Sequence, residues 1–97
     1  SAGKRDLLNF INVTSDEIEH LMIIGHNPAI YEIAASLIGD GAERLLQKLT
    51  QGFVPATLCV IETDSESWKD VAPGQNRIID LVNPMDYNSG DRPTRWM

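Results

Sequence analysis

His26 is the residue of this chain with the clearest potential for chemistry. It follows the apolar run Leu21–Ile24 and Gly25, and it precedes Asn27 and Pro28. If the run is a buried strand and the proline opens a helix, His26 lies where α/β proteins bind ligands. The free N–H groups and the positive dipole end of that helix favour an anion. The pattern predicts a phosphate or carboxylate site, while a histidine that only fills the turn remains the alternative.

The same segment can also be compared with the active-site motif of serine hydrolases. Their nucleophile elbow also joins a strand to a helix, through the motif Gly-x-Ser-x-Gly. In Gly-His-Asn-Pro-Ala, Asn27 stands where the serine is required and Ala29 stands where the second glycine is required. The sequence therefore argues against a serine hydrolase.

The sequence around the other reactive side chains predicts structural roles for them. The single cysteine, Cys59, lies in the apolar run Ala-Thr-Leu-Cys-Val-Ile-Glu, which is typical of a small buried side chain and excludes an internal disulfide. The acidic segment around Glu62, Asp64 and Glu66 lacks the glycine and the further oxygen ligands of a calcium loop. We expect a solvated turn there, and we expect neither a metal nor a cofactor.

The elements that must position His26 follow from periodicity and from helix-end signals. Apolar residues at helical spacing predict a helix over 3–13, and the run 21–25 predicts a strand buried on both faces. Asn27 as a cap and Pro28 at the first turn predict a helix that Gly39 ends in a left-handed conformation. A second helix is expected within 39–52, strands over 56–63 and 77–82, and an irregular tail over 85–97.

This order of elements predicts an α/β fold with about three strands and two to three helices in one domain. A strand as apolar as 21–25 requires neighbours on both edges and layers on both faces. About three strands and two to three helices barely supply these neighbours and layers. The pattern therefore indicates part of a larger sheet, and the exposed flank of 21–25 predicts self-association of the isolated chain.

Composition and charge narrow the range of partners. The chain has 97 residues, a formal net charge of −6 and the apolar share of an ordinary globular protein. Nucleic acids and anionic membranes are not expected as partners, because both require a basic face. No apolar stretch reaches the ~18 residues of a membrane span, and no signal segment opens the sequence. A cytoplasmic location is the expectation.

The segment Leu-Met-Ile-Ile-Gly-His-Asn-Pro-Ala-Ile-Tyr-Glu-Ile-Ala-Ala-Ser-Leu resembles the second signature of the histidine phosphatase superfamily, in its SixA-like branch. The later segments Phe-Val-Pro-Ala-Thr-Leu-Cys-Val-Ile-Glu, Ser-Trp-Lys-Asp-Val-Ala-Pro-Gly and Ile-Ile-Asp-Leu-Val-Asn-Pro follow in the order of that branch, so the resemblance spans residues 5–87. It implies a three-layer α/β/α domain of the phosphoglycerate mutase-like fold. It also implies a phosphatase that works through a phosphohistidine intermediate, without a cofactor.

The resemblance also assigns roles to residues. In this superfamily a first histidine, in an Arg-His-Gly motif, attacks phosphorus, and a second histidine stabilises the transferring phosphoryl group. His26 matches the second histidine, while Gly25, Asn27 and Ala56 would line the pocket. The implied substrate is phosphohistidine on a phosphotransfer or signalling protein, or a small phosphorylated metabolite.

The chain departs from the family at the nucleophile. It contains no Arg-His-Gly, and its only other histidine, His20, lies at the wrong end of the predicted strand. None of the arginines Arg44, Arg77, Arg92 and Arg95 matches a family position. We therefore expect residues 1–97 to be the C-terminal half of the domain and to be inactive alone. The alternative is a non-catalytic module that binds phosphate or a protein.

Overall fold

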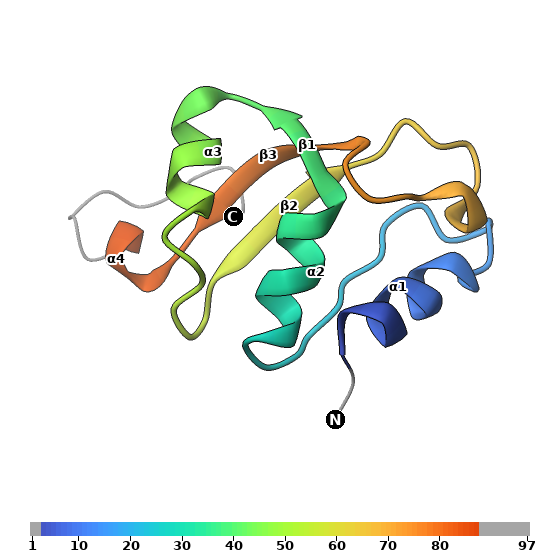
Figure 1. Ribbon diagram of the computed structural model, residues 1–97, viewed down its shortest axis with the longest axis horizontal. Coiled ribbons are helices and arrows are strands. Elements are labelled where there is room, and N and C mark those ends of the chain that lie inside the picture. The colour runs from blue at the N-terminus through green and yellow to red at the C-terminus, as the bar shows by residue number, and fades with distance from the viewer. Residues whose placement is uncertain (1–2, 88–97) are drawn as a thin grey trace.

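The computed structural model describes residues 3–87 and contains a small mixed sheet with helices around it (Figure 1). The elements are α1 (Lys4–Asn12), α2 (Ala29–Leu37), β1 (Ile38–Gly41), α3 (Glu43–Leu49), β2 (Leu58–Glu62), the 3-10 helix η1 (Trp68–Asp70), β3 (Asn76–Val82) and α4 (Pro84–Tyr87). The predicted α/β class is confirmed at this level. None of the helices in this part of the chain is long and apolar enough to cross a bilayer.

β3 is the central strand of the sheet. The strand order is β1-β3-β2, with β1 parallel and β2 antiparallel to β3. Ile78 of β3 pairs with Gly41 on one side and with Ile61 on the other, so all three strands meet at its level. The residue is 1% exposed. An apolar strand with β-branched residues and a neighbour on each edge is the expected centre of such a sheet.

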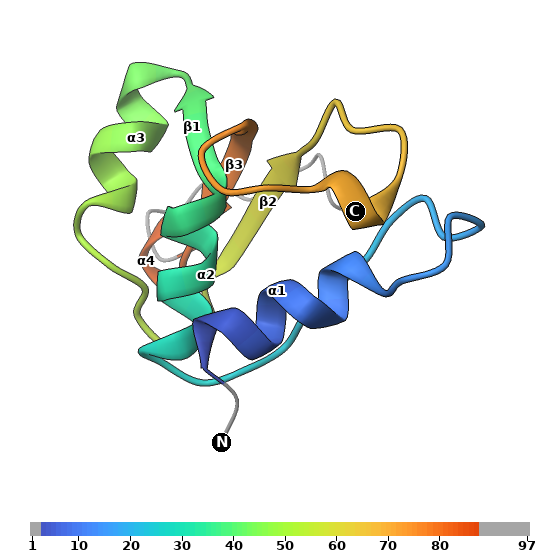
Figure 2. The same ribbon diagram turned by 45° about the vertical axis from the view of Figure 1, so that its right-hand side comes forward.

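Two apolar clusters hold the helices in place. The first joins α1, α2 and the segment after η1, through Leu7, Ile11, Ile33, Leu37 and Val71. The second joins α3 to β3, through Leu45, Leu49, Ile78 and Leu81. The helical spacing of the leucines in 39–52 predicted this inward face correctly. Figure 2 shows α1 and α3 at opposite sides of the fold, with α2 between them.

The predicted strand over 21–25 is wrong. Residues 21–25 form no strand, and their backbone makes no hydrogen bond within the described part of the chain. Met22 is 73% exposed and Ile24 is 89% exposed. The physical reason is that a strand exists only through pairing, and residues 3–87 offer this run no neighbour.

The third strand of the sheet is β1, which arises from a segment predicted to end a helix. Gly39 does not adopt the left-handed conformation of a helix cap; its backbone lies in β1, against the backbone of Gly74. The positive φ angle occurs instead at Gly41, where the strand ends. Residues 85–87, predicted to begin an irregular tail, belong to α4, and the rest of that tail lies outside the described residues.

Candidate functional site

His26 lies at the corner between the extended segment and α2. Its carbonyl accepts a hydrogen bond from the backbone N–H of Ile30 at 3.1 Å, and this bond begins the helical ladder. Gly25, His26 and Asn27 are all exposed. The imidazole is therefore open to solvent at the N-terminal end of a nine-residue helix. The predicted position before a helix is confirmed, but the predicted strand before His26 is absent, so His26 does not lie at the carboxyl end of a strand of the sheet.

Asn27 has a different role from the one predicted. The helix begins at Ala29 with Pro28 as its N-cap, and no side chain caps it. Asn27 lies one residue too early to act as the cap. Its amide nitrogen instead donates to the carbonyl of Phe53 at 2.7 Å. The uncapped first turn leaves backbone N–H groups without side-chain partners, which is the feature that attracts anions at helix N-termini.

The Asn27–Phe53 hydrogen bond holds the loop between α3 and β2 beside the His26 corner. Figures 1 and 2 both show this loop next to the start of α2. Ala56 is exposed in the same loop and has a φ of 66°. The structure thus brings together the two segments that carry the four predicted site residues. They form an open surface corner, with Glu32 as a negative charge in the first turn of the helix.

Two of the basic side chains form ion pairs with carboxylates elsewhere in the fold. Arg77 pairs with Asp40 at 3.3 Å across β3 and β1, and Lys48 pairs with Asp86 at 2.8 Å. Arg44 lies on α3, and Arg92 and Arg95 lie outside the described residues. His20 precedes the corner by six residues, at the far end of the extended segment. Within residues 3–87, the corner offers an imidazole and helix N–H groups to an anion but no second histidine of its own.

Comparisons with known proteins returned no relatives. No family model, curated protein or solved structure matches the chain. The function of the chain is therefore inferred from the motif and from the geometry of the corner.

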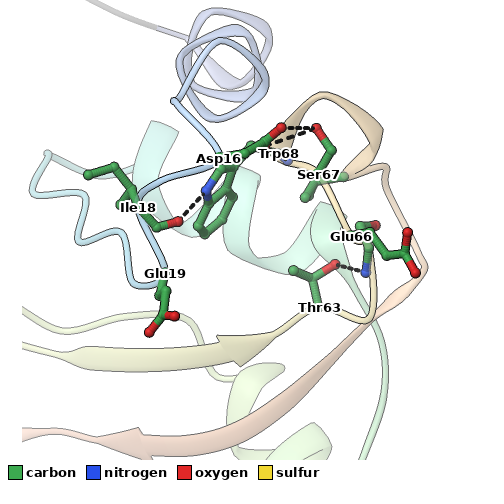
Figure 3. A pocket seen from close by; sticks show the side chains of 9 residues that line it. Asp16, Ile18, Glu19, Thr63, Glu66, Ser67 and Trp68 are labelled. Atoms are coloured by element: carbon green, nitrogen blue, oxygen red, sulfur yellow. Dashed lines mark hydrogen bonds between the residues drawn. The ribbon is translucent and has the colours of Figure 1, made fainter.

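A pocket of about 250 Å³ lies elsewhere, between the loop after α1 and the segment that leads from β2 to η1 (Figure 3). Trp68 donates its indole N–H to the carbonyl of Ile18 at 2.7 Å. The carboxylate of Asp16 accepts from the hydroxyl of Ser67 at 3.0 Å and from the backbone N–H of Trp68 at 3.1 Å. Sequence analysis missed this arrangement, because its partners are about fifty residues apart and carry no motif.

The lining of this pocket does not suit phosphate. Asp16, Glu19 and Glu66 place carboxylates around it, and like charges repel an anion. None of the four predicted site residues lines it. Across residues 3–87, no group of three or more His, Cys, Asp and Glu side chains is arranged to hold a metal ion.

Cys59 lies half-buried in β2 and faces the second apolar cluster. Burial, together with the negative charge of Asp80, raises the pKa of the thiol to about 11. Both effects penalise the thiolate, which is the nucleophilic form. The structure therefore agrees with the predicted role as a small buried side chain.

We expect Cys59 to react slowly with iodoacetamide. At pH 8, raising the pKa from 9.0 to about 11 lowers the thiolate fraction roughly a hundredfold, and the higher intrinsic nucleophilicity of a more basic thiolate restores about tenfold of this. The folded chain should thus be alkylated about tenfold more slowly than the urea-unfolded chain. The rate should rise with pH toward a midpoint near 11. A midpoint near 9 would contradict the burial of this thiol.

Proposed function

We propose that this chain is the C-terminal half of a cytoplasmic phosphatase of the histidine phosphatase class, in a phosphoglycerate mutase-like α/β/α domain. The observation that carries the proposal is the exposed His26 in Gly-His-Asn-Pro at the uncapped start of α2. The run 21–25 supports it, because an exposed, continuous apolar sequence without a neighbour is typical of a segment that pairs inside a larger sheet.

The proposed reaction has two steps. An upstream histidine nitrogen attacks phosphorus, the bond to the leaving group breaks, and the leaving group takes up a proton from solvent, which the water consumed in the second step returns. Water then attacks the phosphohistidine and releases inorganic phosphate together with the free histidine. His26 would donate a hydrogen bond to an equatorial phosphoryl oxygen, where negative charge is concentrated in the transition state.

The surroundings of His26 would position the phosphoryl group. The Asn27–Phe53 hydrogen bond fixes the loop that carries Ala56 beside the corner, and the first turn of α2 directs N–H groups toward it. Gly25, Asn27 and Ala56 would line the bound group. Because the corner is open and lies on the surface, phosphohistidine on a protein fits it better than a small metabolite that needs enclosure.

The proposal is tested on the full-length protein that contains the upstream segment. Incubation with a 32P phosphodonor should give an acid-labile, alkali-stable label, and His26→Gln should lower the rate of hydrolysis by about 10²–10³-fold. His20→Gln is the matched control, since it removes the other histidine of this chain and should leave the rate unchanged. The absence of acid-labile label, or equal losses in the two variants, would contradict the mechanism.

A non-catalytic phosphate-binding or interaction module is the second candidate. It is favoured because His20, the only other histidine of this sequence, lies six residues before His26 at the far end of the extended segment. The two functions differ in the upstream reading frame. An Arg-His-Gly segment there supports the phosphatase. Its absence, combined with binding of a phosphorylated peptide by residues 1–97, supports the module.

A further inference from the structure

Within residues 3–87, the segment Leu21–Gly25, hereafter the apolar run, combines exposed apolar side chains with unpaired backbone groups. Leu21 is 39% exposed, Met22 73% and Ile24 89%, whereas Ile23 packs against the first apolar cluster. The exposure of Met22 and Ile24, with Ile23 turned inward between them, is the alternation of a strand with one covered face. The run is an extended segment without secondary structure that leads to the start of α2 (Figure 1).

The backbone of the run supports the same view. No hydrogen bond joins its N–H or C=O groups to any other described residue. An exposed row of unpaired backbone groups on an apolar segment is a template for pairing with another chain. The free edge of β2 is a weaker template, because β2 already pairs with β3 and its apolar residues are half-buried.

The distribution of charge shows where two copies of this chain can meet with the least repulsion. The molecule has a net charge of −6, so two copies repel each other over most of their surfaces. Residues 20–31 nevertheless contain no Asp, Glu, Lys or Arg, and the apolar run lies inside this neutral stretch. A contact between two copies is opposed least where neither copy carries a carboxylate.

We propose that the chain forms a two-fold dimer in which the apolar runs of two copies pair as antiparallel strands centred on Ile23. In this register Met22 of each copy lies opposite Ile24 of the other. The four exposed side chains become two apolar cross-strand pairs. Glu19 lies opposite the partner's Asn27, so no carboxylate faces another. An isologous contact of this kind closes at two copies.

The register has a consequence for the candidate site. It places the partner's His20 opposite His26, at each end of the paired strands. The corner at the start of α2 thereby gains an imidazole that a single copy does not bring to it. This inference concerns residues 1–97 without an upstream segment. In the full-length phosphatase proposed above, an upstream strand would occupy the same edge of the apolar run, so the dimer would not form there and His20 would not lie opposite His26.

Sedimentation velocity of the chain tests the dimer. The parent chain should sediment as a dimer at micromolar concentration, and Ile24→Lys should raise the dissociation constant at least tenfold, because a charge enters an apolar pair. Val13→Lys is the matched control, since Val13 is 78% exposed and lies outside the run. It should dimerise like the parent. Circular dichroism should show that all three chains are folded.

Two results would overturn the proposal. One is a parent chain that stays monomeric at several hundred micromolar. The other is an Ile24→Lys variant that dimerises as well as the Val13→Lys control, which would place the contact on another surface, such as the free edge of β2.

The register has its own test by disulfide trapping. In a Cys59→Ser background, chains carrying Met22→Cys and Ile24→Cys are mixed and oxidised with glutathione disulfide, which takes up two electrons and two protons as the new disulfide forms. Directly opposite positions have Cβ atoms close enough for a disulfide. The mixed 22–24 disulfide should dominate. A majority of 22–22 or 24–24 disulfides would reject the pairing centred on Ile23.

Discussion

Replacing Gly39 with alanine is expected to destabilise this protein by at least about 3 kcal/mol. A Cβ atom at this position would lie 1.9 Å from the carbonyl oxygen and 2.6 Å from the carbonyl carbon of Gly74. Both contacts are with backbone, so no side-chain rotation relieves them. A hydrogen bond also fixes the position of this loop, because the N–H of Gly74 donates to the carbonyl of Ser36 at 2.9 Å.

The cost of Gly39→Ala follows from what must move. Either β1 leaves β3, or the loop at Gly74 loses its hydrogen bond to Ser36. Overpacking in a rigid site costs about 1–3 kcal/mol and sometimes more. Because the clash here is with backbone, we expect a loss of at least about 3 kcal/mol, out of a total stability on the order of 5–15 kcal/mol.

Urea unfolding followed by circular dichroism measures this loss. Gly25→Ala is the matched control, because a Cβ there would meet only the side chain of Ile30, at 3.6 and 3.8 Å. We expect this control to stay within about 0.5 kcal/mol of the parent chain. An unfolding midpoint for Gly39→Ala equal to that of Gly25→Ala would show that β1 and the Gly74 loop are not in contact.

The conformation of Gly39 could not be predicted from the sequence. Glycine after a helical apolar pattern predicts a left-handed cap, yet Gly39 lies in β1, a strand of four residues of which two are glycine. Its local propensity for a strand is low. Only pairing with β3, more than thirty residues later, makes this segment a strand. Information of that kind is absent from a local window of sequence.

The prediction for residues 21–25 was wrong for the opposite reason. Its propensity for a strand is high, but a strand also requires a neighbour, and the described residues provide none. The elements that were predicted well, α1, α2, α3, β2 and β3, are those whose apolar pattern meets a partner within the chain. Local pattern and tertiary contact agree in these five elements, and this agreement is what makes sequence reasoning succeed.

The candidate site was predictable in position but not in detail. The motif located Gly25, His26 and Asn27 at an exposed corner before α2, and the Ala56 loop lies beside it. The bond from Asn27 to Phe53 could not be predicted, because it links residues 26 positions apart through a side chain expected to cap the helix. The hydrogen bond from Trp68 to Ile18 could not be predicted either, because it also links residues far apart in the sequence.

The second large effect is expected at the centre of the sheet, where Ile78→Ala should destabilise the protein by about 3 kcal/mol and Ile79→Ala by less than about 1 kcal/mol. The two residues are neighbours in β3, but Ile78 is 1% exposed and Ile79 is 47% exposed. Truncating Ile78 removes the side chain that packs with Leu45 and Leu49 of α3, at the level where β1 and β2 both pair with β3. Urea unfolding of the two variants separates burial from strand propensity, because both lose the same atoms from the same strand. Equal losses would mean that α3 does not cover this face of β3. The loop after α3 would then lack its support from the sheet. Asn27 holds this loop beside His26, so the corner would also change.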